Sequence, residues 1–394
     1  MAGEATMVGG RGLGAARIRP ATLGEARDAV RDTPGALVFR GGGTKQGWGA
    51  RAERVDAVVE TAGLDTLVEH SAGDMVAIVG AGMRLSALRD ALAPSGQWLA
   101  VDPPAQEAGA TLGGVVATND HGPRRLRYGA PRDLVIGVTV VLADGSVARA
   151  GGRVVKNVAG FDLMRLLCGS FGTLGLMTEL IVRLHPLPES SLTLAVEGDE
   201  AALCGLVLAL LASPVEPTAL DVAGGVLAVR IEGRQAGVTG RAEAARALAK
   251  AQDLKAGDQL EGEDEAKAWR LLTAAHDGAP GETVARAATL PDRLPRVAAA
   301  LREVAPEATL ASHAGLGLHT ARFPPGEHAE AVRAWRCRVA ALGGTVALRR
   351  HTRDLGSPAD VWGPEPSAIS VMRRVKARLD PDRRCAPGRF VGGI

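Results

Sequence analysis

A glycine-rich run directly behind an apolar stretch is the first part of the sequence that could bind a ligand. Ala36–Phe39 predicts a buried strand, and the next ten residues, Arg40–Gly49, contain five glycines together with Thr44 and Lys45. Bare backbone N–H groups and a lysine are suited to a pyrophosphate, whereas a flexible hairpin tip is the competing interpretation. The run matches neither the P-loop pattern nor the G-x-G-x-x-G of a Rossmann helix, which disfavours nucleotide hydrolysis and a Rossmann NAD site.

Two more glycine segments repeat this chemistry. Gly109–Asn119 is the second, and Gly169–Gly175 has three glycines in seven residues. The third segment lies between a predicted short helix over 161–167 and a predicted strand over 176–184. Separate glycine segments of this kind favour one extended ligand that is held from several sides.

A basic bend follows the second glycine segment. Arg124, Arg125 and Arg127 stand close to His121 and to Tyr128, the one tyrosine of the chain. Arginines in a bend can clamp a substrate carboxylate or pair with acids of the protein itself, and both readings stay open.

The elements that must position these segments follow from periodicity and turn signals. An entry strand and a helix are predicted over 18–32, with Thr22 as the helix cap and Glu25 completing a capping box. Further predicted elements are strands at 57–60 and 75–80, a helix at 85–92, and a hairpin around the turn 143–145.

Length and composition bound the class of protein. A chain of 394 residues is too long for one small core and predicts two domains. The formal net charge of +2 and the 3% of aromatic residues give no case for nucleic-acid binding. Four cysteines without a C-x-x-C pair argue against an iron–sulphur or zinc cluster and against a disulfide framework, so a reducing, cytoplasmic location is expected.

The ends of the chain and the membrane question complete this picture. Residues 1–16 read as a flexible leader without the apolar region of a signal peptide. The longest apolar run, Leu203–Ala212, is far too short for a bilayer span of roughly 20 residues. Any membrane attachment is therefore expected to run through partner subunits.

From about Ser190 to Asp360 the sequence becomes rich in Ala, Leu and Glu, which predicts a second domain. Helices are predicted at 200–212, 240–252, 263–275 and 291–304, and strands at 219–223, 225–232, 308–314 and 345–350.

Five motifs in order carry a resemblance to a known family. They are R-G-G-G-T at 40–44, D-P-P with T-L-G-G-V-V-A-T-N at 102–119, Y-G-x-x-R-D-x-V at 128–135, K-N-V-A-G-F-D-L at 156–163 and G-S-F-G-T-L-G at 169–175. The order resembles the FAD-binding domain of the vanillyl-alcohol oxidase (PCMH-type) flavoproteins. More narrowly, residues 151–175 are similar to the FAD-binding subunit of bacterial glycolate oxidase, the GlcE type.

This resemblance implies a fold and a domain plan. The fold is α+β, with a two-subdomain FAD-binding domain, an α+β cap domain and a C-terminal segment that returns to the FAD domain. The implied boundaries are 1–16 for the leader, 17–188 for the FAD domain, 189–365 for the cap and 366–394 for the returning segment.

The resemblance also implies the cofactor site. The first loop would hold the pyrophosphate of FAD, the second segment would line the ribityl chain and isoalloxazine, and the third would hold the pyrophosphate and adenine end. FAD should be noncovalent, because Thr44 follows the glycines where some members carry a flavin-linked histidine. The cofactor-binding residues predicted are Arg40, Gly41, Gly42, Gly43, Thr44, Lys45, Gln46, Gly47, Trp48, Pro103, Thr111, Leu112, Gly113, Gly114, Ala117, Thr118, Asn119, Gly122, Gly169, Ser170, Gly172, Thr173, Gly175 and Met177.

Histidines in the cap region are the remaining candidates for chemistry. In related catalytic subunits an H-A-G-x-G segment supplies two metal-binding histidines and a later E-H-G-I-G segment supplies more ligands. Here the segment His313–His319 has its second histidine one residue early, and no E-H-G follows. Two histidines make a poor divalent site, so no metal is predicted and a strand edge with a turn is preferred. His351 is another candidate proton acceptor, or a surface residue.

The closing residues resemble the family's D-P-x-x-x-x-N-P-G-R segment, which returns to the FAD domain beside the flavin. Ala386 stands where the family has asparagine, which removes a side-chain contact at the flavin.

Three functional hypotheses follow. The first is the FAD-binding electron-transfer subunit of a glycolate oxidase complex, working with a catalytic flavin subunit and an iron–sulphur subunit. The second is a self-sufficient FAD-dependent D-2-hydroxy-acid dehydrogenase, in which Arg124 or Arg125 holds the carboxylate and His313 or His351 accepts the hydroxyl proton. The third is a flavin-binding scaffold without turnover, and the intact glycine loops argue against a scaffold that has lost flavin.

Overall fold

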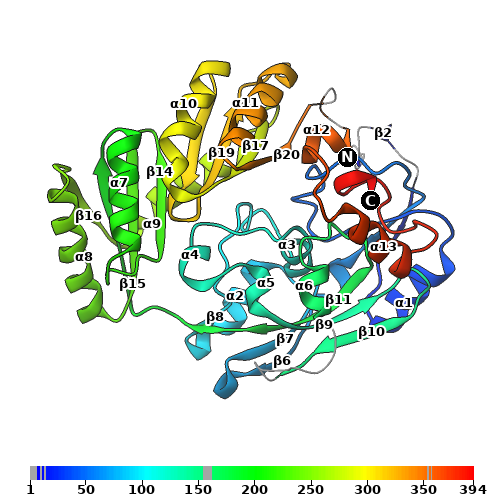
Figure 1. The fold of residues 1–394 in the computed structure, drawn as a ribbon. Coiled ribbons are helices and arrows are strands. Elements are labelled where there is room, and N and C mark those ends of the chain that lie inside the picture. The colour runs from blue at the N-terminus through cyan, green and yellow to red at the C-terminus, as the bar shows by residue number, and fades with distance from the viewer. Residues whose placement is uncertain (1–6, 9–10, 13–14, 154–161, 353–354, 356) are drawn as a thin grey trace, which may run out of the picture. The chain divides into compact units, whose positions relative to one another are not determined.

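The computed structural model describes residues 7–8, 11–12, 15–153, 162–352, 355 and 357–394. The chain forms two compact units (Figure 1). The first comprises Met1–His121, Ala130–Leu187 and Gly356–Ile394, and the second Gly122–Gly129 and Pro188–Leu355. Residues 122–129, which carry the basic bend, thus belong with the second unit. Most of the K-N-V-A-G-F-D-L motif and of the expected leader lies outside the described residues.

The first unit contains a parallel and an antiparallel sheet. The parallel sheet has the order β3 (Ala16–Ile18), β5 (Ala57–Glu60), β4 (Leu37–Arg40). The antiparallel sheet has the order β10 (Val147–Gly151), β9 (Val135–Val141), β11 (Leu176–Arg183), β7 (Val76–Gly80), β6 (Leu67–Ser71). Two short pairs join β12 (His185–Pro186) to β8 (Gln97–Trp98) and β1 (Met7–Val8) to β2 (Arg11–Gly12). The helices are α1 (Leu23–Asp32), α2 (Leu85–Leu92), α3 (Leu112–Thr118), α5 (Pro131–Leu134), α6 (Leu163–Leu167), α12 (Pro358–Trp362) and α13 (Ile369–Leu379).

Local signals in the sequence explain where these helices begin. The Thr22 hydroxyl accepts a hydrogen bond from the Glu25 N–H at 3.2 Å, and the Glu25 carboxylate accepts one from the Ala21 N–H at 2.8 Å. Thr111 caps α3 in the same way by accepting from the Gly114 N–H, and Asn119 ends α3 in the left-handed region. α3 contains two glycines and two valines, which are poor helix formers. Its helical conformation must therefore be stabilised by its capped ends and by its packing.

Two apolar cores lie inside the first unit. One packs α2 and α3 against β7, β9 and β11, and the other packs α1 against β4 and β5. The α+β fold expected of a two-subdomain FAD-binding domain is confirmed.

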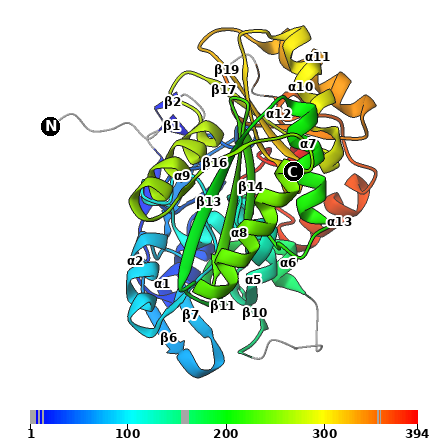
Figure 2. The ribbon, with the colours of Figure 1, turned by 90° about the vertical axis from the view of Figure 1, so that its left-hand side faces the viewer.

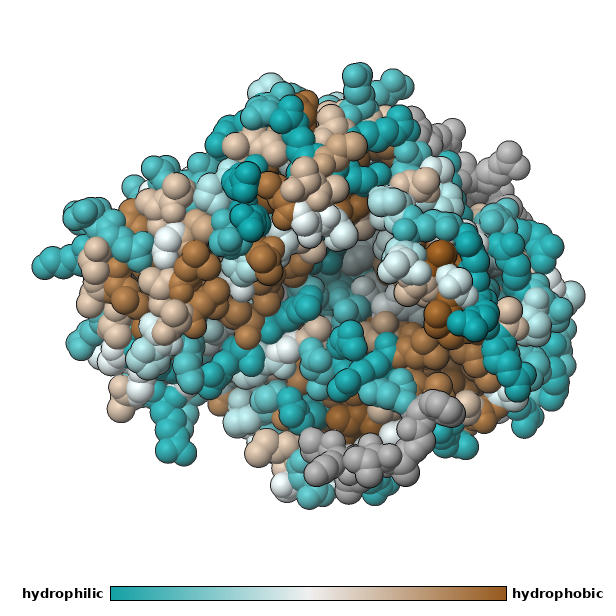
Figure 3. Space-filling model, viewed as in Figure 1, coloured by the Kyte–Doolittle hydropathy of each residue, from teal (hydrophilic) through white to brown (hydrophobic). Residues whose placement is uncertain are grey.

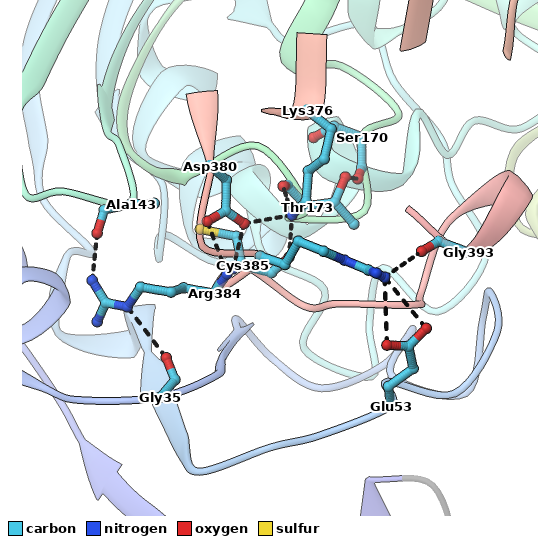
Figure 4. A network of polar contacts seen from close by, with 11 residues as sticks. Gly35, Glu53, Ala143, Ser170, Thr173, Lys376, Asp380, Arg384, Cys385 and Gly393 are labelled. Atoms are coloured by element: carbon cyan, nitrogen blue, oxygen red, sulfur yellow. Dashed lines mark hydrogen bonds and ion pairs between the residues drawn. The ribbon is translucent and has the colours of Figure 1, made fainter. Parts of the chain in front are cut away.

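The C-terminal segment returns to the first unit, as predicted (Figure 4). Lys376 on α13 is buried and its ammonium donates to the carboxylate of Asp380 at 2.5 Å, to the Thr173 carbonyl at 2.7 Å and to the Cys385 carbonyl at 2.9 Å. Cys385 then pairs with Leu37 of β4 as an isolated parallel bridge. The tail is thereby tied to the third glycine segment and to the strand that precedes the first.

The second unit is built on one eight-stranded antiparallel sheet. Its order is β16 (Ala256–Leu260), β13 (Ser190–Glu197), β15 (Val226–Gly233), β14 (Ala219–Ala223), β18 (Thr309–His313), β19 (Leu318–Phe323), β17 (Thr283–Ala288), β20 (Thr345–Arg350). Its helices are α4 (Arg125–Tyr128), α7 (Glu200–Leu211), α8 (Gln235–Lys250), α9 (Gly262–Asp277), α10 (Leu294–Val304) and α11 (Ala329–Ala341).

Alternation along β14 separates the two faces of this sheet. Leu220 and Val222 enter the core with α7 and α8, whereas Ala219 packs with Trp269 of α9. In Figure 2, α8 and α9 lie on opposite sides of β13. The turn predicted within His313–His319 is present, but the prediction of a strand edge is wrong, because β18 and β19 are interior strands. No helix in the described part of the chain has the length and apolar character that a bilayer crossing requires.

Candidate FAD site

A hollow in the first unit collects residues from all three glycine segments. It opens at the end of β4 and is bordered by the loop after Arg40, by the start and one side of α3, and by residues 171–177. The loop after β4 follows a series of turns with positive φ at Gly43 and Gly49, a backbone conformation that glycine adopts without strain.

Many of the residues predicted from the resemblance line this hollow together. They are Arg40, Gly41, Gly42, Gly43, Thr44, Lys45, Gln46, Thr111, Gly113, Gly114, Ala117, Thr118, Gly172, Gly175 and Met177.

Other predicted residues lie elsewhere. Leu112 is buried in the core beneath α3, and Asn119 accepts a hydrogen bond from the Cys168 thiol at 3.3 Å. Gly122 belongs to the second unit. The remaining predicted residues outside the lining of this hollow are Gly47, Trp48, Pro103, Gly169, Ser170 and Thr173.

The sequence alone did not single out seven lining residues. Most are apolar or small residues brought in by neighbouring strands, and one is an arginine from the C-terminal tail. They are Val38, Phe39, Thr61, Ala81, Phe171, Leu176 and Arg389. Arg389 carried a detectable signal, because it is the last residue of the closing P-G-R motif.

The glycines let the loops approach closely enough to form one wall. A Cβ on Gly42 would lie 1.8 Å from the Gly109 carbonyl oxygen, and a Cβ on Gly41 would lie 2.0 Å from the Thr111 hydroxyl. A Cβ on Gly113 would lie 2.8 Å from Ala81. Because any side chain at these positions would force the segments apart, the cradle requires glycine. A narrow, glycine-walled hollow fits a long cofactor that is held through backbone groups.

Positive charge is available in the same hollow. The Lys45 side chain is 7% exposed, and its ammonium lies 3.3 Å from the fully buried carboxylate of Asp120 and 5.7 Å from the centre of the Trp48 ring. The carboxylate balances the lysine charge in the protein, and the ring fixes its direction. The Lys45 ammonium and the backbone N–H groups of the loop are donors that could meet the phosphates of FAD.

A second hollow adjoins the third glycine segment. It has a volume of about 310 Å³ and lies between α6, residues 168–174, α13 and the last residues of the chain. Gly169, Ser170 and Thr173 line it, so these three predicted cofactor residues face a different space from Gly172 and Gly175. Leu166 and Val371 stay 38% and 49% exposed on α6 and α13, and Figure 3 shows brown, hydrophobic side chains gathered beside α13.

The arginine candidates for substrate binding lie in the second unit. The Arg124 guanidinium donates to the Glu232 carboxylate at 2.6 and 3.2 Å, and Glu232 is 1% exposed at its side chain. Arg124 is therefore paired with an acid of the protein, which is one of the two alternatives that the sequence left open. Arg125 lies half-buried on the same short helix α4.

His313 belongs to a buried histidine–aspartate cluster. Asp221 on β14 accepts from His276 Nε2 at 3.0 Å and from His313 Nδ1 at 3.2 Å, and the two rings stack with centroids 3.8 Å apart. Since a carboxylate only accepts, both facing ring nitrogens carry protons. The Arg286 guanidinium lies 3.5 Å from His313 Nε2. Burial lowers the pKa of His313 to about 3 despite the neighbouring Asp221 carboxylate, which raises it, so the ring is neutral at pH 7.

Asp221, His276 and His313 could geometrically hold a metal, because their ligand atoms lie within 4.8 Å of one another. The nitrogens that would bind the ion instead donate to Asp221, and the guanidinium of Arg286 would lie beside its charge. The arrangement is that of a closed hydrogen-bond network.

The other two histidine candidates differ in environment. His319 is buried between two hydroxyls, with Nδ1 2.9 Å from Ser312 and Nε2 2.9 Å from Thr289. Burial lowers the pKa of His319 to about 4. His351 is half-buried, and its Nδ1 lies 3.0 Å from the Thr352 carbonyl.

Comparison with known proteins agrees with the chemistry of the hollow. Residues 15–151 match the family described as FAD binding domain. The chain is 28% identical over 392 residues to glycolate oxidase subunit GlcD of Bacillus subtilis, covering 90% of this chain and 83% of that protein. It is 39% identical over 160 residues to a D-lactate dehydrogenase of Archaeoglobus fulgidus, covering 41% of this chain and 35% of that protein. It is 35% identical over 182 residues to glycolate oxidase subunit GlcE of Escherichia coli, covering 46% of this chain and 51% of that protein.

Among solved structures, alkyldihydroxyacetonephosphate synthase is similar to this chain with a TM-score of 0.73 at 16% sequence identity, covering 94% of this chain and 75% of that one. That likeness concerns the fold alone. The family match, the relatives and the hollow together assign FAD as the cofactor and make the chain an FAD-dependent oxidoreductase.

Proposed function

We propose that this chain is the FAD-binding subunit of a glycolate-oxidase-type complex, which oxidises a small 2-hydroxy acid and passes the electrons on through flavin. The partners would be a catalytic flavin subunit and an iron–sulphur subunit. FAD, held noncovalently when bound, supplies the two-electron acceptor. The residues of this chain would hold FAD in the first unit, with Lys45 and the three glycine segments at the phosphates.

The observation that carries this proposal is the state of His313. A substrate base needs a free nitrogen with a pKa near the working pH. His313 Nδ1 is already a donor to Asp221, Nε2 lies against Arg286, and the ring is 1% exposed. A neutral imidazole with a pKa of about 3 is a poor proton acceptor, which favours an electron-transfer role over substrate oxidation.

The second candidate is a self-sufficient D-2-hydroxy-acid dehydrogenase. It is favoured by the Bacillus subtilis relative, whose likeness extends over 90% of this chain and so includes the second unit. Under this alternative Arg124 or Arg125 holds the carboxylate, and Arg124 would have to leave Glu232 to do so. His351 is half-buried whereas His313 is 1% exposed, so a substrate could reach His351 more readily as the base.

Anaerobic titration of the purified chain separates the two candidates. Glycolate and D-lactate are added to the flavin-loaded chain while the flavin absorbance is followed. We expect the flavin to stay oxidised with either acid, whereas dithionite should bleach it at once and show that it can be reduced. Prompt bleaching by a hydroxy acid, lost in Arg125→Gln or His351→Asn, would instead establish the self-sufficient dehydrogenase.

We also propose that the Asp221 cluster holds no metal. EDTA should leave the thermal unfolding temperature of the chain unchanged, and added Zn²⁺ should not raise it. A rise with Zn²⁺ that disappears in His276→Gln would overturn this part of the proposal.

A further inference from the structure

Arg389, in the C-terminal tail, is bound to the cofactor loop through four acceptors. Its Nη2 donates to the carbonyls of Lys45 at 3.3 Å, Gln46 at 2.9 Å and Trp48 at 3.1 Å, and its Nη1 donates to the Gln46 side-chain oxygen at 3.2 Å. The Arg389 carbonyl in turn accepts from the Ala50 N–H at 3.0 Å. One residue of the C-terminal tail thus anchors the loop that follows β4.

The charge of Arg389 has no carboxylate to balance it among the described residues within ion-pair distance. The side chain is 5% exposed. The two buried lysines of the same unit each have an acid, Asp120 for Lys45 and Asp380 for Lys376. Burial alone lowers the pKa of Arg389 to about 10, so the guanidinium stays charged at pH 7. A buried cation that is met only by neutral oxygens is costly unless an anion comes to it.

Arg389 also lines the FAD hollow, beside Gly41–Gln46. The anion that enters this hollow with the cofactor is a pyrophosphate, and a guanidinium is well suited to phosphate oxygens.

We propose that Arg389 is a positioning residue for FAD. It holds the 41–49 loop in the conformation that binds the cofactor, and it supplies a positive charge that the pyrophosphate of FAD balances. The proposal rests on FAD as the cofactor and is independent of which partner receives the electrons. The tail then contributes a charged side chain to the FAD site in addition to its own packing on the first unit.

Arg384 provides a matched control in the same tail. Its guanidinium also bonds backbone carbonyls, those of Gly35 at 3.3 Å, Ala143 at 2.5 Å and Val30 at 2.8 Å, but it does not line the hollow (Figure 4). Substitution of Arg384 weakens tail docking without removing a charge from the FAD site. If Arg384→Gln does not fold, the exposed Arg383, which is bonded to Glu53, takes its place as Arg383→Gln.

The test measures FAD affinity and apoprotein stability for the wild type, Arg389→Gln, Arg389→Lys and Arg384→Gln. Apoprotein is prepared by removing the flavin, its fold is checked by circular dichroism, and FAD binding is followed by quenching of flavin fluorescence. A wild type that binds no FAD would refute the cofactor assignment itself rather than the role of Arg389.

We expect Arg389→Gln to raise the Kd for FAD about 10- to 100-fold, the size of a charge-assisted contact. Arg389→Lys keeps the positive charge and loses the planar guanidinium, so it should raise the Kd less than Arg389→Gln does. Arg384→Gln should lower the unfolding temperature of the apoprotein at least as much as Arg389→Gln does. It should change the Kd for FAD by less than about threefold. Equal effects of Arg389→Gln and Arg384→Gln on Kd, or a Kd for Arg389→Gln within about threefold of the wild type, would overturn the proposal.

Discussion

Acid should destabilise the second unit through His319, and the size of the effect can be worked out. The ring is buried between the hydroxyls of Ser312 and Thr289, and burial lowers its pKa from 6.5 to about 4. Because the folded pKa lies below the unfolded one, the unfolded chain binds more protons between these values. The stabilisation is therefore complete above pH 6.5 and is lost as the pH falls toward 4. At pH 5 the loss from this one group is about 2 kcal/mol.

The perturbation is His319→Gln, which keeps a polar side chain between the two hydroxyls and removes the titrating group. The free energy of unfolding is measured in urea at pH 7 and pH 5 on apoprotein, with tryptophan fluorescence as the readout. Trp269 and Trp335 are buried in the second unit and report on it. A surface change on α9, Leu271→Gln, is the control, because Leu271 is 67% exposed.

The stability difference between wild type and His319→Gln should shrink by about 2 kcal/mol between pH 7 and pH 5. For Leu271→Gln it should stay constant. If the difference for His319→Gln is the same at both pH values, His319 is not held neutral by burial and the reasoning is refuted.

Three further changes test the first unit. Gly42→Ala would place a Cβ 1.8 Å from the Gly109 carbonyl and should leave the purified chain with little FAD. Full flavin content after gel filtration would contradict the claim that the FAD site requires glycine at this position. Ala386→Gly should stabilise the chain by about 0.5 to 1 kcal/mol in calorimetry, because Ala386 has a φ of +42° that glycine adopts without strain; a clear loss of stability would argue against strain there. Lys376→Met should cost about 3 to 5 kcal/mol in urea unfolding, because it leaves the buried Asp380 carboxylate without its cation; a cost below about 1 kcal/mol would show that the pair contributes little.

Sequence patterns predicted the elements whose signals are local. The cap at Thr22, the helix at 85–92 and the strands at 219–223 and 345–350 follow from capping residues and periodicity, and the structure has them. Strands 283–288 and 318–323 were missed. Their alanines, threonines and arginines show no clear alternation, and only pairing with neighbours across the sheet makes them strands.

The functional residues, too, can be predicted from the sequence only where their signals are local. The glycine-rich segments indicate a ligand site by their own composition, and most of their residues line the FAD hollow. Arg389 is more than 340 positions from its partners in the first loop, so only the folded tail could reveal its role. Asp221 carries a local signal in the sequence, because an acid inside an apolar strand must find partners when it is buried.

The most direct test of the account is the flavin content of the purified wild-type chain. After heat or acid denaturation, about one FAD per chain should appear in the supernatant, because the proposed site would hold FAD through backbone loops and two cations rather than through a covalent bond. A chain without FAD, or flavin that stays with the precipitated protein, would contradict the central claim.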